Sequence, residues 1–418
     1  MAPLAVTTED DRAAASSAAP RDRATSNGRA HLFVAPWKVT DVGGVNQVIL
    51  NLYRQFEAGG VYTPRILVTS WDCVRPSKSD EQGRSVTRLR LRSPYGAQAP
   101  VRSFVKWILW LLPELSRLAR YLRANDVSNV NVHYPSLAAL QFVLARYVFK
   151  HELKIILSFH GLELVHAFGT KGLERWLWRL LLRRSDAVVI CSNALKALVL
   201  GLEPKIASRV KTIHNGVDID NLMIGRNPGA RIDSRLDGRR FILSVASYER
   251  KKGLDTLLRA FRTVRADYGP EIMLAFVGTD RGMGDELRQI ATKMGLIDHV
   301  VFCGEIPHSD LHAYYQTASV FCLASRAEPF GIVLLEAGAF RCPVIATSVG
   351  GIPEILADNI NACLVPPDDP LALAAQLQRL LSDHQERDRL ANALFEHVRA
   401  CFPWENAYGS YLKLCREV

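Results

Sequence analysis

The stretch SVFCLASRAEPFGIVLLE, residues 319–336, contains the pattern that decides the fold of this chain. Residues 319–325 form a short apolar run with the length and composition of a buried strand. Pro329 fits the first position of a following helix, which leaves Glu328 in the loop and Glu336 two turns into the helix. A strand that leads through a charged loop into a helix is the repeating unit of a parallel α/β sheet.

The same alternation of strand-like and helix-like runs continues along almost the whole chain, in two series. It favours parallel α/β architecture built from βαβ units. The strand candidates of the first series are HLFVAP (31–36), RILVT (65–69), VNVH (130–133), KIILSF (154–159), AVVICS (187–192) and VKTIH (210–214). Those of the second series are FILSVAS (241–247), IMLAFVG (272–278), HVVFCG (299–304), SVFCLAS (319–325), PVIAT (343–347) and ACLVP (362–366).

The domain organisation follows from the length of 418 residues, which exceeds the usual size of one hydrophobic core. We predict two Rossmann-like domains, at residues 31–218 and 241–400, that face each other across a cleft. The stretch 219–240 is expected to be a linker, because it is rich in Asn, Gly, Pro, Asp and Arg and has little apolar periodicity. Residues 1–30 are expected to form a disordered tail, and residues 401–418 a C-terminal helix that packs back on the first domain.

The charge of the chain is unevenly distributed. The composition, 48% apolar and 22% charged, is that of an ordinary globular protein, and the net charge is +10. Residues 1–218 hold 30 Lys and Arg against 17 Asp and Glu, a net +13, whereas residues 219–418 hold 22 against 25, a net −3. A basic half suits nucleic acid, an anionic membrane or a phosphorylated substrate, and charge alone does not choose among them.

The sequence favours a cytoplasmic protein. The first 30 residues contain no apolar run of the kind that signal peptides need. The longest dense apolar stretch, Trp107 to Leu112, ends at Pro113 and is far shorter than the roughly 20 residues that span a bilayer. The eight cysteines stand singly, with no spacing typical of zinc ligands, so we expect reduced thiols.

The segment from Phe104 to Leu122 combines tryptophan and leucine side chains with nearby Lys106 and Arg117. This combination is found in helices that dock on membrane surfaces. It is also found in packed amphipathic helices whose basic side faces water. Both interpretations are open at this stage.

Four glycine and histidine positions in the first half are candidates for a binding site. Gly43 and Gly44 precede an amphipathic helix, where bare backbone N–H groups can approach a phosphate or a reacting sugar, although two glycines often form only a turn. His160 directly follows the strand candidate at 154–159, so its ring should project toward the cleft. His133 ends the candidate at 130–133 and competes with His160 as the cleft imidazole.

Basic residues follow the first strand candidate of the second half. Lys251 and Lys252 lie just before Gly253 and a helix, with Arg250 beside them. Ammonium groups together with helix N-terminal amides form a binding site for a diphosphate. We therefore expect this loop to bind a phosphorylated ligand.

The two glutamates of EPFGIVLLE are expected to bind different parts of one ligand. If both were helical, Glu328 and Glu336 would lie about 12 Å apart along the axis, at about 1.5 Å per residue. A retaining hydrolase pair needs about 5 Å between its carboxyl groups. The spacing thus excludes a hydrolase pair on one helix.

These residues resemble a known signature. EPFGIVLLE is similar to the signature of two glutamates with seven residues between them in retaining GT-B glycosyltransferases, a superfamily that includes glycogen synthase and lipopolysaccharide and mannosyl-phosphoinositide glycosyltransferases. The chain looks family 4-like. The resemblance runs from about His31 to the C-terminus. The further matches are Gly43 and Gly44, SFHG around His160, HNGVD at 214–218, the KKG that contains Lys252, and VGGIPEIL at 349–356.

The resemblance implies a role for each matched residue. Glu328 would contact the hydroxyls of the transferred sugar, and Glu336 would bond to the nucleotide ribose. Lys251 and Lys252 would neutralise the diphosphate, and His160 would lie close to the sugar. The catalytic candidates are Glu328, His160 and Lys252; the donor-binding candidates are Gly43, Gly44, Arg250, Lys251, Lys252, Phe330, Gly331 and Glu336.

The resemblance also implies a mechanism and domain roles. The first domain would bind the acceptor and the second the nucleotide sugar. The lysines and helix amides would stabilise the leaving diphosphate without a metal or another cofactor, and no protein nucleophile would be needed. Asp218 and Asp220 spell a DxD pattern, which we interpret as chance because lysines already neutralise phosphate. The family often has Gly-Arg where this chain has Ala246 and Ser247, so phosphate neutralisation would depend on the lysine loop.

The sequence therefore predicts a metal-independent retaining hexosyltransferase. Its donor would be a UDP- or GDP-sugar, and its acceptor a glycan or lipid-linked molecule of cell-surface polysaccharide biosynthesis, presented at the inner face of an anionic membrane. The alternatives are a nucleotide-sugar epimerase or a phosphorylase on the same fold, because fold does not fix function. A nucleic-acid binder is disfavoured, since aromatic residues do not interleave with the basic ones on any recognisable module.

Overall fold

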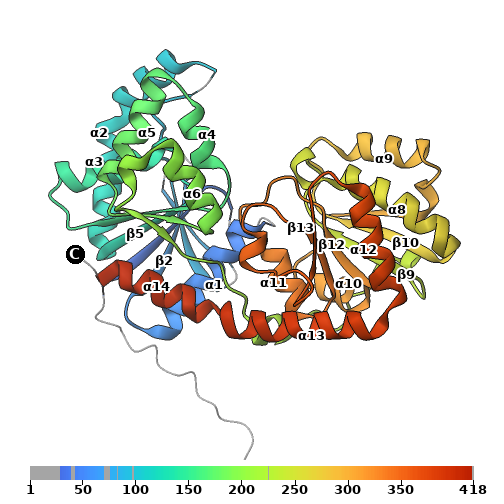
Figure 1. Cartoon of the computed structure of the whole chain (residues 1–418). Helices are drawn as coiled ribbons and strands as arrows, with labels where there is room; N and C mark the ends of the chain where they lie inside the picture. The colour runs from blue at the N-terminus through green and yellow to red at the C-terminus, as the bar shows by residue number, and fades with distance from the viewer. Residues whose placement is uncertain are drawn as a thin grey trace, which may run out of the picture.

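The computed structural model describes residues 29–38, 43–69, 76–81, 83–96, 98–224 and 226–416. Its chain forms two lobes, each built around one sheet with helices on its faces (Figure 1). The predicted architecture of two Rossmann-like α/β domains is therefore confirmed. The tail expected at 1–30 lies outside the described residues except for its last two.

The first lobe contains an eight-stranded sheet with the order β3-β4-β2-β1-β5-β6-β7-β8. Its ladders are parallel apart from that of β3 with β4. The strands are β1 (Ala30–Ala35), β2 (Thr63–Thr69), β3 (Ser77–Glu81), β4 (Arg84–Leu89), β5 (Val127–His133), β6 (Lys154–Phe159), β7 (Ala187–Ile190) and β8 (Val210–Thr212).

The second lobe contains a six-stranded parallel sheet with the order β11-β10-β9-β12-β13-β14. Its strands are buried on both faces, which explains why they read as continuous apolar runs in the sequence. They are β9 (Arg240–Val245), β10 (Ile272–Val277), β11 (Val300–Gly304), β12 (Val320–Leu323), β13 (Val344–Thr347) and β14 (Cys363–Val365).

Each sheet reverses its strand order next to its first strand. In the first sheet, β1 lies between β2 and β5, and in the second, β9 lies between β10 and β12. Ligands of open α/β sheets bind beyond the carboxyl ends of the strands at such a switch point. The loops after β1, β5, β9 and β12 are therefore the places where a site is expected.

The helices of the first lobe and of the segment that follows it are α1 (Gly44–Gly59), α2 (Pro100–Ala124), α3 (Leu140–Val148), α4 (Glu163–Gly169), α5 (Gly172–Arg184), α6 (Asn193–Leu202) and α7 (Ile219–Ile224). Those of the rest of the chain are α8 (Leu254–Tyr268), α9 (Gly284–Lys293), α10 (Leu311–Thr317), α11 (Ile332–Ala339), α12 (Pro370–Ser382), α13 (His384–Cys401) and α14 (Trp404–Arg416). Among the described helices, none is long and apolar enough to span a bilayer.

Three features differ from the sequence expectations. The hairpin of β3 and β4 was not predicted, because β3 has the sequence SKSDE and carries no apolar signal. The expected linker contains the short helix α7. Finally, α11 begins at Ile332 and not at Pro329, because Gly331 adopts a left-handed φ of 97° just before it, and Glu336 lies only about one turn into the helix.

The last two helices connect the lobes. Figure 1 shows α13 running along the second lobe and α14 along the first. Helix α14 buries Trp404, Ala407 and Tyr411 against a cluster that includes Phe33 of β1 and Phe56 of α1. The C-terminal end of the chain thereby packs on the first sheet.

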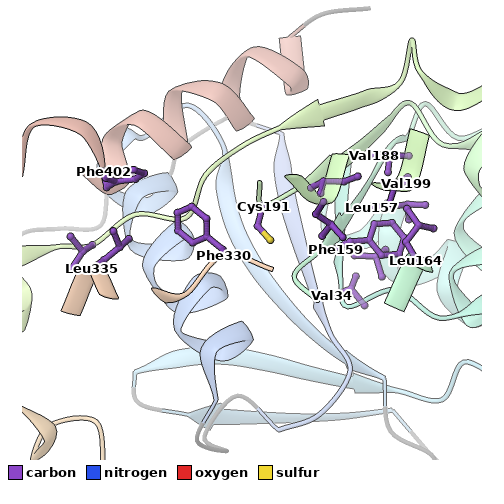
Figure 2. Close-up of a cluster of buried hydrophobic side chains, with 14 of the residues drawn as sticks. Val34, Leu157, Phe159, Leu164, Val188, Cys191, Val199, Phe330, Leu335 and Phe402 are labelled. Carbon is purple, nitrogen blue, oxygen red and sulfur yellow. The ribbon is translucent and has the colours of Figure 1, made fainter. Parts of the chain in front are cut away.

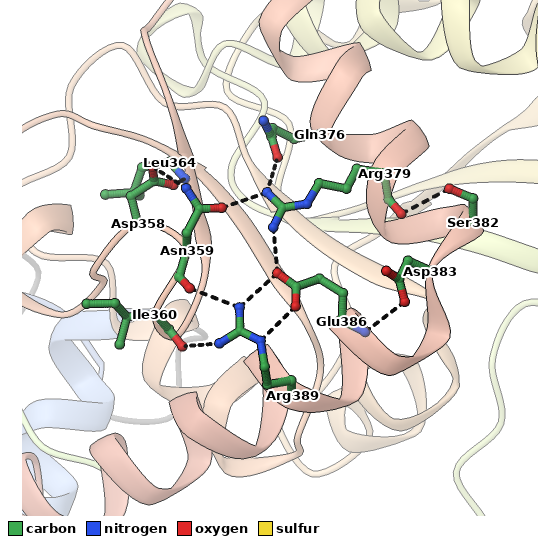
Figure 3. A network of polar contacts seen from close by, with 10 residues as sticks. All are labelled: Asp358, Asn359, Ile360, Leu364, Gln376, Arg379, Ser382, Asp383, Glu386 and Arg389. Atoms are coloured by element: carbon green, nitrogen blue, oxygen red, sulfur yellow. Dashed lines mark hydrogen bonds and ion pairs between the residues drawn. The ribbon is translucent and has the colours of Figure 1, made fainter.

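An ion-pair network fixes the corner where α12 meets α13 (Figure 3). Glu386 of α13 accepts hydrogen bonds from Arg379 of α12 at 2.5 Å and from Nε of Arg389 at 2.7 Å. Arg389 also donates to the carbonyl oxygen of Asn359 at 2.9 Å, and Arg379 donates to the Asn359 side chain at 2.6 Å. These bonds join both helices to the loop before β14, so that α13 has a defined direction toward the first lobe.

Candidate active site

The centre of the candidate site is a contact between Lys252 and Glu328. Lys252 lies in the loop after β9 and Glu328 in the loop after β12, and these two strands pair side by side. Lys252 Nζ lies 2.7 Å from Glu328 Oε2, which also accepts a hydrogen bond from Ser325 Oγ at 3.1 Å. The two side chains are only 17% and 8% exposed. The switch point of the second sheet thus holds a largely desolvated cation and carboxylate.

Two glycines make room for the loop that carries Glu328. Gly350 has a φ of +54°, and a Cβ there would lie 2.0 Å from the carbonyl oxygen of Glu328. A Cβ at Gly351 would lie 2.4 Å from the Pro329 carbonyl, and the Gly351 N–H donates to the Glu328 carbonyl at 3.0 Å. The VGG of the sequence is therefore needed because two loops approach each other backbone to backbone.

Arg326 also contacts the loop that carries Lys251 and Lys252. It was not identified from the sequence. Its guanidinium makes two 2.8 Å bonds to the carboxylate of Asp255, and its backbone N–H donates to the Lys251 carbonyl at 2.7 Å. The bonds to Asp255 raise the pKa of Arg326. Gly253 completes the turn with φ +61°. The position requires glycine, because a Cβ there would lie 2.0 Å from the Ala324 carbonyl oxygen.

The neighbouring cations of this loop have other partners. Arg250 is exposed and lies 3.2 Å from Glu286, and Lys251 Nζ lies 2.9 Å from Glu249. Within the described residues, Lys252 is thus the cation that pairs with Glu328. Lys251 and Arg250 lie on the same loop but pair with Glu249 of that loop and Glu286 of α9, respectively.

Glu336 belongs to a separate polar cluster in the second lobe. Its carboxylate accepts a hydrogen bond from Tyr315 at 2.9 Å and contacts His308 Nε2 at 3.0 Å. Burial and the charge of Glu336 raise the pKa of Tyr315 well above its usual range. Burial alone would lower the pKa of His308, but the bond to Glu336 raises it overall. Neither partner carried a sequence signal, because each is a lone polar residue far from Glu336 in the chain.

Phe330 and Gly331, between the two glutamates, have structural roles. Phe330 is 2% exposed, and its ring lies 5.5 Å from that of His214 and 6.0 Å from that of Phe402. Figure 2 shows it between Phe402 and Cys191 in the hydrophobic cluster. Its side chain is therefore part of the core. Only the backbone of Phe330 would be available to contact the sugar donor.

Two imidazoles lie beside the switch point of the first sheet. His160 follows β6, and its Nε2 lies 2.9 Å from Nδ1 of His133, the last residue of β5. The two competing candidates of the sequence are therefore neighbours. Beside them, Glu163 accepts the Gly161 N–H at 2.7 Å, and burial raises the pKa of its carboxyl.

Gly44 begins α1 and faces the second lobe. A Cβ at this position would lie 3.8 Å from Cδ1 of Ile332, the first residue of α11. Gly43 has an extended backbone, and among the described atoms nothing lies within 4 Å of a Cβ placed there. The start of α1 therefore lies close to the start of α11 in the facing lobe.

The DxD pattern has a structural explanation. Asp218 accepts the backbone N–H of Asn221 at 2.9 Å and so caps the first turn of α7. No group of three or more His, Cys, Asp or Glu that could hold a metal occurs in the described part of the chain.

The structure has two α/β domains with parallel sheets, and loops with charged or imidazole side chains lie where the domains face each other. This is the arrangement of a GT-B glycosyltransferase. Family comparisons agree with this class. Residues 42–221 match the Glycosyltransferase Family 4 model, and residues 230–397 match that of Glycosyl transferases group 1. The chain belongs to the family 4-like GT-B glycosyltransferases.

Similar proteins cover nearly the full chain. The chain is 28% identical over 393 residues to a D-inositol 3-phosphate glycosyltransferase of Catenulispora acidiphila, covering 90% of this chain and 91% of that one. It is 28% identical over 388 residues to a phosphatidyl-myo-inositol mannosyltransferase of Mycobacterium leprae, covering 92% and 96%. Among solved structures, a sucrose-phosphate synthase from Thermosynechococcus elongatus has a TM-score of 0.72 at 23% identity, covering 93% and 98%. The HepE protein of Anabaena, solved with UDP and glucose, has a TM-score of 0.69 at 17% identity, covering 93% and 100%. These structural likenesses show the fold.

Proposed function

We propose that this glycosyltransferase is a retaining, metal-independent hexosyltransferase that uses a UDP- or GDP-linked sugar. Its acceptor is a glycan or a lipid-linked molecule of cell-surface polysaccharide biosynthesis. The observation that carries the proposal is the contact of Lys252 with Glu328 at the switch point of the second sheet.

The contact provides one group for the diphosphate of a nucleotide sugar and one for its sugar. The ammonium group of Lys252 neutralises the diphosphate, whose negative charge grows as the bond to the sugar breaks. Glu328 accepts hydrogen bonds from the hydroxyls of the same sugar. Glu336, which contacts Tyr315 and His308, would bond to the ribose. A low-dielectric site strengthens each of these interactions, because the side chains are largely removed from water.

We propose retention of configuration because EPFGIVLLE, with Glu328 and Glu336, resembles the signature of retaining glycosyltransferases. Glu328 is engaged by Lys252 and Ser325, so it serves as a hydrogen-bond acceptor and not as a nucleophile. The acceptor hydroxyl attacks the sugar on the face from which the diphosphate leaves, and a donor phosphate oxygen takes its proton. The lysines and the helix N-terminal amides supply the positive charge, so no metal takes part.

Uridine nucleotides are the first donors to test. The Anabaena HepE structures carry UDP, UDP-glucose, or UDP with glucose, and a structurally similar trehalose-6-phosphate protein from E. coli was solved with UDP-2-fluoro glucose. Calorimetry with UDP, GDP and ADP should register uptake of one of them by the folded protein. A thermal-shift screen of nucleotide sugars then selects the donor. No uptake of any of the three at millimolar concentration would contradict the proposal.

The reaction itself is tested by its product. Incubation of the selected donor with acceptor should release free nucleoside diphosphate and form a glycoside with the donor's anomeric configuration, as read by proton NMR. Activity should persist in EDTA. A glycoside of inverted configuration, or loss of activity that Mg²⁺ or Mn²⁺ restores, would contradict the retaining or the metal-independent part.

An acceptor presented at an anionic membrane is favoured by helix α2. Its first half is apolar and exposed, with exposed fractions of 76% for Val101, 70% for Leu109 and 69% for Leu112. Arg102 and Lys106 are exposed on the same turns, so the surface combines apolar insertion with positive charge. An anionic lipid surface is the partner that complements both properties.

Liposome flotation tests this part. Binding to vesicles that contain phosphatidylglycerol at low salt should weaken in Leu109→Glu. Leu371→Glu is the control, because Leu371 is 73% exposed but lies on α12 in the other lobe. Equal binding of the protein to neutral and anionic vesicles would contradict the anionic preference, and no binding to either would remove the membrane from the proposal.

A further inference from the structure

Three arginines of the first lobe lie together beyond the end of β4. Arg90 and Arg92 follow this strand, and Arg117 lies on the helix α2. All three are partly exposed, so each guanidinium group can reach a ligand from solvent. Leu91, between the first two, lines a hollow at the carboxyl ends of β1 and β5. The three arginines, here called the arginine cluster, therefore lie beside the switch point of the first sheet, where a ligand is expected.

Arg92 joins the end of β4 to α2. Its guanidinium group pairs with Glu114 and lies over the ring of Trp110, 4.9 Å from the ring centre. Oε2 of Glu114 also accepts the Arg92 backbone N–H at 3.0 Å and a side-chain N–H of Gln141 at 2.9 Å. The Glu114 side chain is only 1% exposed. Its negative charge is therefore used by Arg92 and is closed to solvent.

Arg90 and Arg117 have no carboxylate of their own. Neither side chain forms an ion pair or a hydrogen bond within the described residues, and Nε of Arg90 is buried without a partner. Arg117 lies one helical turn after Glu114, on the same face of α2. Burial lowers the pKa of Arg92, and the charges of Arg90 and Arg117 act in the same direction, so both groups lie near it.

The cluster therefore holds three guanidinium groups against one carboxylate. Like charges that are held close together repel each other, and an anion bound between them removes this repulsion. The N–H groups of a guanidinium form a planar fork that matches the oxygens of a phosphate. A phosphate is thus the anion that complements both the charge and the geometry.

We propose that Arg90, Arg92 and Arg117 form a phosphate-binding site, and that its ligand is a phosphate group of the sugar acceptor. That the phosphate belongs to the acceptor rests on the proposed function, whereas phosphate binding rests on the arginine cluster alone. A soluble phosphate ester and a lipid-linked phosphate present the same group to the arginines. Trp110, which contacts Arg92, lies on α2 between the exposed Leu109 and Leu112, so both sources have access to the site.

Calorimetry with glycerol 3-phosphate tests the site without any sugar nucleotide. The measurement uses the full chain with Lys252→Met, so that the cationic loop of the second lobe contributes less to phosphate binding. We expect one saturable site. In the same background, Arg90→Gln/Arg117→Gln should lose affinity roughly tenfold or more, because hydrogen bonds to charged groups are lost.

Arg120→Gln/Arg183→Gln is the matched control. It removes the same charge from two exposed positions of the first lobe, on α2 and α5. The control should bind glycerol 3-phosphate as the parent protein does. Equal weakening in both double variants would show a general attraction of anions and would overturn the proposal. The test needs no donor, so the failure of the proposed function would not change its result.

Vesicles of phosphatidylcholine with phosphatidic acid distinguish the two sources of phosphate. If the site binds a lipid phosphate, vesicle binding should fall more in Arg90→Gln/Arg117→Gln than in the control. If it binds a soluble ester, only glycerol 3-phosphate should discriminate between the two double variants. If neither probe discriminates between them, the site does not exist.

Thermal unfolding separates a binding site from a structural cluster. Since Arg90 and Arg117 have no partner within the described residues, Arg90→Gln/Arg117→Gln should leave Tm unchanged or raise it as repulsion is relieved. Arg92→Gln should lower Tm, because it leaves the buried Glu114 without its cation. A lower Tm in the double variant would assign these two arginines a structural role and would contradict the proposal.

Discussion

Oε2 of Glu354, in the second lobe, lies 2.8 Å from Nε2 of His214, in the segment that leaves the first lobe. The same carboxylate accepts the backbone N–H groups of Asn193 at 2.9 Å and Ala194 at 2.8 Å. These are the first residues of α6, so a carboxylate of one domain caps a helix of the other. The motifs HNGVD and VGGIPEIL lie far apart in the chain. This contact between the domains brings them together.

Replacing Glu354 by Gln should lower the free energy of unfolding, by an amount that depends on pH. Burial alone would raise the pKa of Glu354, but the bonds from Asn193, Ala194 and His214 lower it overall. Its stabilising effect is therefore complete above the ordinary pKa of 4.5 and is lost as pH falls through the lower folded value. We expect urea unfolding at pH 7 to show a loss of about 1–2 kcal/mol, which shrinks as the pH falls below 4.5.

Glu396→Gln is the control for this measurement. Glu396 is 53% exposed and pairs with Arg399 on the surface of α13, so its loss should change stability by less than about 1 kcal/mol. A constant difference between wild type and Glu354→Gln from pH 7 to pH 4 would contradict the assignment of the effect to this carboxylate.

Lys252 and Glu328 should matter more than the neighbouring Lys251. Lys252→Met or Glu328→Gln removes one half of the largely buried pair, and loss of electrostatic stabilisation of this kind lowers kcat by roughly 10²-fold or more. Lys251→Met should cost less, because Lys251 is 47% exposed and pairs with Glu249. Steady-state kinetics with the selected donor checks the ranking, and equal losses for both lysines would be the contrary result.

The sequence was sufficient to place these candidates because each one follows an apolar strand. Lys252 and Glu328 come after β9 and β12, and parallel strands bring their following loops to one edge of the sheet. The sequence could not show which cation meets Glu328, because Lys251 and Lys252 are adjacent and have the same chemistry.

The contacts that support the site were invisible in the sequence for a different reason. Tyr315 and Glu336, or Glu354 and Asn193, are joined by packing between elements distant in the chain, and no local pattern specifies such pairs. The hairpin of β3 and β4 was missed because strand prediction relies on apolar alternation, which β3 lacks. Pro329 suggested a helix start, but the left-handed turn at Gly331 delays it.

Adding one methyl group should have opposite effects at two glycines. In Gly350→Ala the new Cβ meets the Glu328 carbonyl oxygen at 2.0 Å on a backbone with φ +54°, so the loop that carries Glu328 must move. We expect lower stability and weaker donor binding. In Gly409→Ala, within α14, nothing among the described atoms lies within 4 Å of the new Cβ, and alanine should stabilise the helix by about 0.5–1 kcal/mol. Thermal unfolding and calorimetry with UDP measure both effects, and a tolerated Gly350→Ala would contradict the close approach of the two loops.

The polar cluster around Glu336 can be tested by removing a single oxygen. Tyr315 is 1% exposed, and its ring packs against those of Phe321 and Phe340 at 5.6 and 5.8 Å, so Tyr315→Phe keeps the packing and deletes only the bond to Glu336. Because Glu336 is assigned to the ribose, which is bound equally before and during sugar transfer, the change should raise KM for the donor with little effect on kcat. A lost hydrogen bond of about 1 kcal/mol corresponds to a roughly fivefold change in affinity.

Tyr314→Phe is the matched control, since the Tyr314 hydroxyl accepts the N–H of Asp233 at 3.1 Å and has no bond to Glu336 within the described residues. A fall in kcat at constant KM in Tyr315→Phe would instead place Glu336 next to the reacting sugar, and the two glutamates would then have to share one role.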